Sequence, residues 1–356
     1  MSEHRFSRRL LAWYDRHGRQ ALPWKRKPDP YRIWISEIML QQTQVKTVIP
    51  YFNRFIGHFP NVRALARAET DAVLHLWTGL GYYARARNLH KAAQQIVAQH
   101  AGVFPRAFDA VADLPGIGRS TAGAILALAF GQRHAILDGN VKRVLARFHA
   151  IDTPLNKRAT EDRLWRLAEQ HTPRKRVADY TQAIMDLGAT VCVRTNPRCT
   201  VCPLHVNCRA YRHGSPEVYP VRIGVRRAPL KATRMLMIRD RRGHVLLQRR
   251  PPVGLWGGLW GFPECLDGDA CHWCREALGL NVQTETPWPV LRHNFSHYHL
   301  NITPIPARVV GGTDQLMENP ETVWYNLNQP DRRGFSAPVK RLLDQLRASR
   351  SIREDT

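Results

Sequence analysis

Four of the seven cysteines lie within one 17-residue stretch, and their thiols are the side chains best suited to bind a metal. They are Cys192, Cys199, Cys202 and Cys208, with the spacing C-x6-C-x2-C-x5-C. Cysteine thiolates are soft ligands, and four of them complete one coordination shell. Pro197 and Pro203 keep the backbone between them out of a helix, so it can wrap around a metal centre. The spacing leaves three states open: an iron–sulfur cluster, a zinc ion, or unligated thiols.

The stretch contains only one Cys-x2-Cys pair, whereas zinc knuckles usually use two such pairs. This favours the iron–sulfur cluster. A second group, Cys265, Cys271 and Cys274, has no fourth cysteine to close a site, so we interpret these residues as thiols. His272 is a weak candidate for an additional ligand there.

Two carboxylates occupy environments that would separate their acidities. Glu37 stands in an otherwise apolar run, where a carboxylate costs free energy unless it is hydrogen-bonded or functional. Pairing with a buried backbone group or an arginine is the structural alternative. Asp138 stands where an apolar segment meets a helix N-terminus, where it can cap the helix and be kept ionised by the helix dipole.

Consecutive amphipathic helices account for the chain from about Phe6 to Tyr211. Asp29-Pro30 begins a helix, which we expect to carry Glu37, continue toward Ile49 and be limited by Pro50. The polar run Gln41 to Gln44 falls on that same predicted helix. It would hydrogen-bond to base edges, or be an ordinary solvated face.

Two turns in this helical region could contact nucleic acid. Gly79 to Asn88 leads from a short helix, capped by Thr70-Asp71, into a basic helix, and its Tyr82 and Tyr83 could wedge into a base stack or simply cover the core. Leu114 to Ser120 is a helix-hairpin-helix turn, whose glycines allow a close approach and whose N–H groups can hold a phosphate.

The helix after that hairpin is predicted over 121–130 and ends at Gly131, and two more helices follow at about 161–170 and 177–190. Residues 214–230 are rich in proline and basic residues and predict a linker. Beyond it, strands near 235–238, 245–248, 290–295, 299–309 and 323–327 and a helix over 337–346 predict an α+β module. We therefore predict a mainly α domain (1–213), a linker (214–230) and an α+β domain (231–356).

The net charge is +24 and is unevenly distributed. Residues 231–356 carry 17 Lys and Arg against 13 Asp and Glu, so +4 belongs to them and +20 to residues 1–230. A field of that sign favours a polyanion, most simply nucleic acid, although solubility alone would also explain it. No apolar run reaches membrane length and no secretory signal is visible, so we expect a cytoplasmic protein with no membrane partner. We also expect it to be a monomer and to associate with the nucleoid.

The cysteine spacing resembles the [4Fe–4S] loop of the helix-hairpin-helix DNA glycosylases, the endonuclease III superfamily, and the hairpin and both carboxylates repeat the likeness. The resemblance is strongest to the adenine glycosylase (MutY) branch, over nearly the whole chain. It implies a base-excision-repair enzyme that flips adenine out of double-stranded DNA and hydrolyses its N-glycosidic bond. The loop cysteines would then hold a [4Fe–4S] cluster, and the hairpin would grip one DNA strand and carry a monovalent cation.

The family's residue roles are carried over by matching motifs. By this resemblance, Glu37 protonates adenine at N7 and Asp138 stabilises the sugar cation. Glycoside hydrolysis uses two carboxyl groups in the same way. Asn140 resembles the catalytic-site amide. Superfamily members that also cut the strand carry a lysine where this chain has Ser120, so a mainly monofunctional enzyme is implied. The matching DNA contacts are Gln42, Tyr82, Leu114, Gly116, Gly118 and Arg119.

The second domain resembles the Nudix-like domain of the same enzymes. Two acids that would bind magnesium are missing near Ala277 and Leu278, so we expect recognition rather than pyrophosphate hydrolysis. Phe295, Ser296 and His297 match the loop that contacts 8-oxoguanine, which implies A:8-oxoguanine and A:G mispairs as substrates; a strand-end hairpin with a solvated histidine is the alternative.

Two other functions fit parts of the sequence. An endonuclease III-like enzyme for oxidised pyrimidines would share the helical domain, but Ser120 and the appended domain argue against it. A non-catalytic iron–sulfur redox sensor that binds DNA would share the cysteine loop, but it would not need Glu37 and Asp138.

Overall fold

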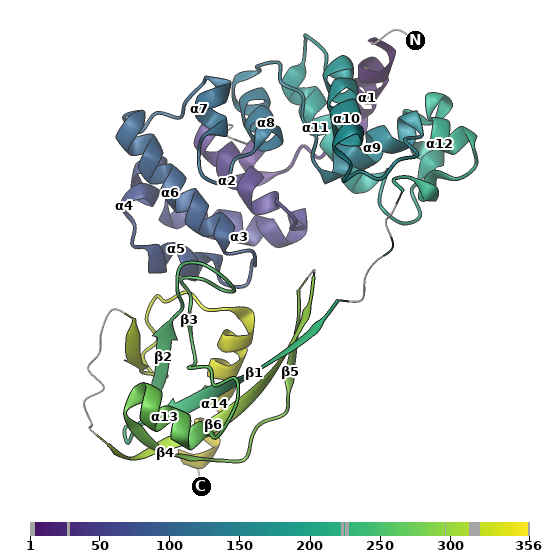
Figure 1. Cartoon of the computed structure of the whole chain (residues 1–356). Coiled ribbons are helices and arrows are strands. Elements are labelled where there is room, and N and C mark those ends of the chain that lie inside the picture. Colours follow the sequence, from purple (N-terminus) through teal and green to yellow (C-terminus); the bar gives the residue numbers. More distant parts are fainter. Residues whose placement is uncertain are drawn as a thin grey trace. The chain divides into compact units, whose positions relative to one another are not determined.

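The computed structural model describes residues 4–26, 29–221, 224, 228–295, 297–312 and 321–354 (Figure 1). The chain divides into two compact units. The first comprises Met1–Arg67 and Asn88–Val225, and the second comprises Ala68–Arg87 and Arg226–Thr356.

The first unit is helical, as the sequence predicts. Its helices are α1 (His4–His17), α2 (Pro30–Leu40), α3 (Val45–His58), α4 (Val62–Arg67), α6 (Ala84–Gln99, which begins in the second unit), α7 (Phe108–Ala112), α8 (Arg119–Phe130), α9 (Gly139–His149), α10 (Arg158–His171), α11 (Val177–Thr190) and α12 (Arg209–Arg212). Short 3-10 turns lie at Pro23–Lys25, Cys199–Val201, His205–Asn207 and Pro216–Val218. The apolar faces of α1, α9 and α11 meet in one core, around Leu10, Leu145 and Leu187.

The predicted helix from Asp29 to Ile49 is wrong in its second half. Asp29 does cap α2, accepting a hydrogen bond from the N–H of Arg32 at 3.1 Å. The helix ends at Leu40, because Gln41 has a non-helical ψ of 110° and Gln42 then adopts a left-handed backbone with φ of 58°. A new helix, α3, starts at Val45 and contains Pro50. The polar run 41–44 is therefore a turn.

The helix-hairpin-helix is present as α7, a turn and α8. Gly116 has a φ of 81°, and a Cβ at this position would come within 2.9 Å of the Cβ of Asn88. Glycine is thus required both for the backbone conformation and for the close approach of α6. Gly118 caps α8, and Gly131, with a φ of 67°, ends it as predicted.

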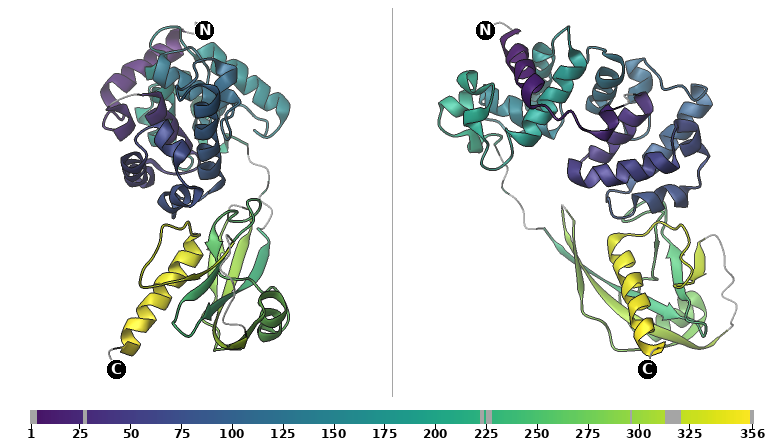
Figure 2. Two further views of the ribbon diagram at one scale, coloured as in Figure 1. Left: turned by 90° about the vertical axis from the view of Figure 1, so that its left-hand side faces the viewer. Right: turned by 180° about the vertical axis from the view of Figure 1, so that it is seen from behind.

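The second unit is built on a sheet with strands β1 (Leu230–Arg239), β2 (Val245–Arg249), β3 (Trp260–Gly261), β4 (Leu280–Thr284), β5 (Leu291–Asn294), β6 (His299–Gly312) and β7 (Thr322–Tyr325). The order is β3-β2-β1-β6-β4, with β5 paired to β6 and β7 to β2. β1 and β6 run parallel and the other pairs are antiparallel. Helices α13 (Ala270–Leu278) and α14 (Ala337–Glu354) cover opposite faces of the sheet (Figure 2).

Every strand predicted for this module is present, whereas β3, α13 and β4 were not predicted. Cys265 and Cys274 are fully buried in the core between α13 and the sheet, and Cys271 packs against it. Burial raises the pKa of Cys274 to about 12, so this thiol stays protonated at neutral pH.

Residues 68–87, with helix α5 (Thr70–Trp77), pack as part of the second unit. Two side-chain hydrogen bonds fix the segment: Tyr83 Oη to the carbonyl of Phe335 at 2.8 Å, and Trp260 Nε1 to Asp71 Oδ2 at 3.1 Å. Leu74 and Trp77 are fully buried. No pattern in the sequence predicted this grouping.

In the ranges that the structure describes, no helix combines the length and the apolar character needed to cross a membrane.

Candidate active site

A cavity of about 1200 Å³ in the helical unit brings together both predicted catalytic carboxylates. Its walls come from α2, the 41–44 turn, the start of α3 and the N-terminal ends of α8 and α9, closed by α11. The lining residues that the sequence singled out are Glu37, Gln42, Ser120, Asp138 and Asn140.

Burial raises the pKa of both carboxyl groups, Glu37 and Asp138. Burial raises the pKa of Glu37 to about 8, and the negative charge of Asp138 adds to the rise. That second effect requires Asp138 to ionise before Glu37. With a pKa of about 8, Glu37 therefore keeps its proton at neutral pH.

Asp138 is held by the helix that it begins. Its Oδ1 accepts a hydrogen bond from the N–H of Val141 at 2.7 Å, which makes it the N-cap of α9. Burial raises the pKa of Asp138 above its usual range, while the N–H groups of Val141 and Asn140 and the charge of Arg143 act in the opposite direction. The helix start thus supports a carboxylate in a buried place.

Asn140 and Ser120 are positioned by neighbouring helices. The Oδ1 of Asn140 accepts a hydrogen bond from Arg143 at 2.8 Å, and Arg143 also donates to the carbonyl of Gly188 at 2.7 Å. Gly188 is needed here, because a Cβ would lie 2.6 Å from the Cβ of Asn140. Ser120 Oγ accepts the N–H of Leu137 at 2.9 Å, next to Asp138.

The predicted DNA contacts do not all belong to this cavity. Gln42 lines it and is exposed, and Tyr82 is half exposed within the second unit, with a φ of 50°. Leu114 is buried beneath the hairpin. Arg119 lies over the ring of Trp165, 3.9 Å from its centroid.

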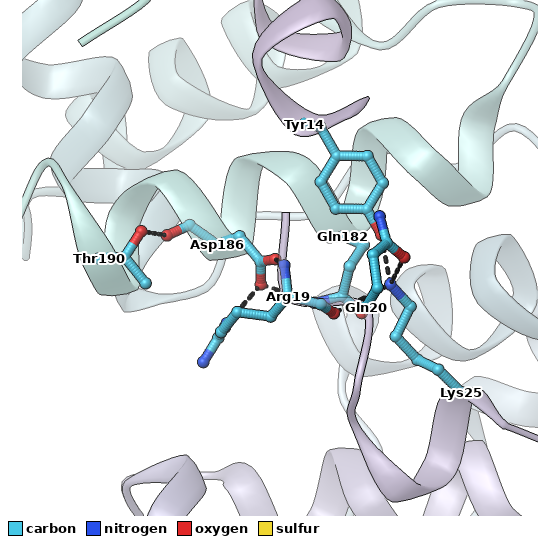
Figure 3. A network of polar contacts seen from close by, with 7 residues as sticks. All are labelled: Tyr14, Arg19, Gln20, Lys25, Gln182, Asp186 and Thr190. Atoms are coloured by element: carbon cyan, nitrogen blue, oxygen red, sulfur yellow. Dashed lines mark hydrogen bonds and ion pairs between the residues drawn. The ribbon is translucent and has the colours of Figure 1, made fainter. Parts of the chain in front are cut away.

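A network of buried polar groups holds the wall of the cavity formed by α11 (Figure 3). Asp186 is fully buried, and it accepts hydrogen bonds from the backbone N–H and the guanidinium of Arg19 at 2.6–2.9 Å. Its Oδ1 also accepts from Nε2 of Gln182 at 2.9 Å. A carboxylate accepts only, so it selects the NH₂ side of the Gln182 amide. The Oε1 of Gln182 is then the atom left for other partners.

Replacing Asp186 by Ala should lower the free energy of unfolding by about 3 kcal/mol, because the guanidinium and N–H of Arg19 lose a buried acceptor. The shift of the urea midpoint, followed by circular dichroism, measures the effect. Asp179→Ala is the matched control, since Asp179 lies on the same helix in an exposed ion pair with Arg176. Equal midpoint shifts in the two variants would contradict this prediction.

Sequence reasoning missed Arg19, Trp24 and Gln182, which line the same cavity. One signal was available for Gln182. Together with Asp186 it places two polar residues four positions apart on the 177–190 helix, hence on one face of it. Arg19 and Trp24 lie in an irregular stretch before α2, where no periodicity indicates a site.

The four loop cysteines line one pocket against α9. Arg147 donates to Sγ of Cys192 at 3.4 Å and to the carbonyl of Val193 at 2.6 Å. Burial raises the pKa of Cys202 to about 12 and also raises the pKa of Cys199 and of Cys208. Among the described residues, no three His, Cys, Asp or Glu side chains are arranged to hold one metal ion. By type and common location, the four thiols fit a centre that takes thiolate ligands.

The predicted recognition loop joins β5 to β6. The N–H of Phe295 donates to the carbonyl of Tyr298 at 2.9 Å and the two rings stack, so the loop is a tight hairpin. His297 is exposed. Ser296 lies outside the described residues.

Two families match the chain. Residues 35–186 match the HhH-GPD superfamily of base excision DNA repair proteins, and residues 234–345 match the NUDIX domain. Among solved structures, a thermostable thymine-DNA glycosylase is similar with a TM-score of 0.54 and 28% identity, covering 59% of this chain and 97% of that one. A trapped endonuclease III–DNA covalent intermediate shares the fold, with a TM-score of 0.51 and 19% identity over 60% of this chain and 99% of that one.

Curated relatives extend over nearly the whole chain. The adenine DNA glycosylase of Buchnera aphidicola subsp. Acyrthosiphon pisum (strain APS) is 39% identical over 348 residues, covering 98% of this chain and 99% of the relative. The adenine DNA glycosylase of Homo sapiens is 33% identical over 395 aligned positions, covering 94% of this chain and 72% of the relative. Together with the helix-hairpin-helix and Nudix-like folds, these likenesses show that the chain belongs to the adenine DNA glycosylases, enzymes of base excision repair.

Proposed function

We propose that this adenine DNA glycosylase excises adenine paired with 8-oxoguanine or guanine in double-stranded DNA, by hydrolysis at Glu37 and Asp138. The observation that carries the proposal is that two carboxyl groups line one cavity: Glu37, whose pKa burial raises to about 8, and Asp138, which caps the start of α9. Glycoside hydrolysis uses such a pair. Because the substrate is double-stranded DNA, we also propose that the enzyme acts at the nucleoid.

The reaction proceeds by protonation of the leaving base. Adenine must be taken out of the stack to reach the cavity, which costs a few kcal/mol. Glu37 gives its proton to N7, because adenine leaves poorly as an anion. As the bond from N9 to C1′ breaks, the sugar becomes cationic, and the carboxylate of Asp138 stabilises it and supports the attack of water at C1′.

The Glu37–Gln182 pair gives the cavity a preference for adenine. Protonated Glu37 is a donor for N7, and Oε1 of Gln182 is an acceptor for the amino group at C6. Guanine offers an acceptor at both positions, so it would leave Gln182 unsatisfied. Among the described residues, none donates a hydrogen bond to this Oε1. The network around Asp186 therefore supports the choice of base as well as the fold.

The N-terminal end of α8 and the turn after α2 are the proposed DNA contacts. N–H groups at Gly116, Gly118 and Arg119 face a strand phosphate, with a monovalent cation bound at the same hairpin. Gln42 and Tyr82 have the left-handed backbone of exposed turn residues, which suits side chains that fill the gap left by a flipped base. Asn140, fixed by Arg143, presents its amide beside Asp138.

A duplex with one A:8-oxoguanine pair tests the function directly. We expect the adenine strand to break only after heating in alkali, because hydrolysis leaves an abasic site and Ser120 cannot form the Schiff base that lyases use. A matched duplex with an oxidised pyrimidine should stay intact. Breaks without alkali, or breaks at the pyrimidine, would support the endonuclease III-like reading instead.

The second unit is the proposed reader of the opposite base. Adenine is normal in DNA, so the error must be recognised from 8-oxoguanine, whose altered edge carries a C8 carbonyl and an N7–H. A serine hydroxyl can donate and accept, so we propose Ser296, which follows Phe295 in the chain, as the contact to this edge.

Replacing Ser296 by Ala should reduce the preference for A:8-oxoguanine over A:G by about tenfold, since one base contact is worth about 1–3 kcal/mol. Single-turnover rates on both duplexes give the ratio. Ser349→Ala, an exposed serine of α14, is the control. An unchanged ratio would move the recognition out of this hairpin.

We also propose that Cys192, Cys199, Cys202 and Cys208 hold a [4Fe–4S] cluster, supported by four thiols on one pocket wall beside Arg147. The cluster would give the loop a fixed conformation. Protein prepared without oxygen should contain iron and sulfide near four each per chain. Stoichiometric zinc without iron would contradict the assignment.

A further inference from the structure

A second hollow in the helical unit, of about 550 Å³, is rimmed by arginines and takes no part in the proposed reaction. Its rim carries five guanidiniums, from Arg5, Arg9, Arg163, Arg209 and Arg212. No aspartate or glutamate is among the described residues that line it. We call it the arginine hollow. Five like charges without a carboxylate raise the local concentration of anions.

Most of these arginines are available to a ligand. Arg9 donates to Oδ1 of Asn207 at 2.8 Å, which directs it along the rim. For Arg163, Arg209 and Arg212, no side-chain hydrogen bond or ion pair to another described residue is present, and Arg163 and Arg209 are exposed. They come from different elements, α10 and α12, so the rim is assembled by the fold rather than by one basic run.

The floor of the arginine hollow contains a pair of histidines. His149 and His171 join through their Nε2 atoms at 2.9 Å, and His171 stacks on Phe6. Burial lowers the pKa of each to about 4, and for His149 the charges of Arg209 and Arg163 add to the effect. Both rings are therefore neutral at pH 7, and their shared bond uses only one of two N–H groups.

One nitrogen of the histidine pair is enclosed by the protein. Nδ1 of His171 is buried and has no hydrogen-bond partner among the described residues. An anion in the hollow would offset the arginine charges. Guanidiniums bind phosphate oxygens with two parallel hydrogen bonds, which favours phosphate over a simple halide.

The arginine hollow is separate from the cavity of Glu37 and Asp138. Asp138 caps the beginning of α9, and His149 is the last residue of the same 11-residue helix. At about 1.5 Å per residue, the two ends lie about 16 Å apart. The two sites share no lining residue.

We propose that the arginine hollow binds a phosphate group, at a site additional to the one where adenine is excised. The phosphate comes either from the DNA backbone outside the excision site or from a free phosphorylated compound. Both sources present the same oxygens to the same guanidiniums, and experiment separates them.

Inorganic pyrophosphate is the probe, with binding measured by calorimetry at low salt on the full chain. We expect the Arg163→Ala/Arg209→Ala double variant to weaken binding at least tenfold, since each loses charge-assisted hydrogen bonds. The control is Arg158→Ala/Arg174→Ala, which removes the same charge from exposed positions outside the hollow. Circular dichroism checks that both variants are folded.

The salt dependence of binding to a duplex without a mispair identifies the source. If the DNA backbone is the ligand, the magnitude of the slope of log K against log salt should decrease in the test variant by about 2 more than in the control. An equal slope, with pyrophosphate binding lost only in the test variant, assigns the site to a free phosphorylated compound. Equal loss of pyrophosphate binding in both variants, or no binding to the unmodified chain, would overturn the proposal. Excision of adenine is not the readout, so the proposed function can fail or hold independently.

Discussion

Adenine excision should fall by about 10²–10⁴ when Glu37 is replaced by Gln, while binding to the mispaired duplex is retained. Gln keeps the size of the side chain and can still donate to N7, but it has no proton to transfer. Single-turnover rates with excess enzyme, together with gel-shift affinities, separate the two effects. Glu169→Gln serves as control, because Glu169 lies in an exposed ion pair with Arg133. Near-normal excision by the Glu37 variant would remove this carboxyl from the mechanism.

The same residue predicts the alkaline limb of the pH profile. Excision by the unmodified enzyme should decline above about pH 8, where Glu37 loses its proton. The ordinary pKa of a glutamate is 4.5, and in the folded chain that of Glu37 is about 8. Between pH 4.5 and 8 the folded chain keeps this proton and the unfolded chain loses it, so the free energy of unfolding decreases as the pH rises through this range. Glu37→Gln should therefore raise the free energy of unfolding at pH 8 and leave it unchanged near pH 4. Burying the acid that the reaction needs therefore lowers the stability of the folded chain.

Asp138→Asn should reduce excision by about 10²–10³, because the sugar cation loses the negative charge placed beside it. Asparagine caps helices as well as aspartate does, so α9 should keep its start and the urea midpoint should stay within error. Asp138→Ala adds a measure of the cap, with a loss of about 1 kcal/mol.

The Asp138→Asn variant also tests whether the charge of Asp138 affects the pKa of Glu37. Since the charge of Asp138 helps to raise the pKa of Glu37, the residual activity should decline at a lower pH than in the unmodified enzyme. An unshifted alkaline limb would mean that the two groups do not share a cavity in solution, and undiminished excision would exclude Asp138 from the reaction.

The sequence predicted well where local signals coincide with the fold. Asp29 and Pro30 carry the chemistry of a helix start, and 177–190 has one clean apolar face, so both helices begin where expected. The break after Leu40 was missed because Gln42 has no turn signature, and its left-handed backbone is imposed by its surroundings rather than by its residue type.

The site was predictable only in part, for a related reason. Glu37 and Asp138 contrast with apolar neighbours, so their chain context marks them. Gln182 is only 4 positions from Asp186 in the chain, whereas Arg19 is 167 positions away. Only folding brings Arg19 to Asp186. The arginine hollow is assembled in the same way from four separate segments.

The inclusion of residues 68–87 in the second unit has a consequence for dissecting the enzyme. If the backbone is cut within 214–230, the piece that carries α5 exposes Leu74, which is buried against Gly334 in the intact chain. The other piece loses the partners of Trp260 and of the Phe335 carbonyl. The separated halves should consequently reassociate on mixing, so that this chain lends itself to fragment complementation, and activity restored by adding the second half would report association rather than catalysis by either piece alone.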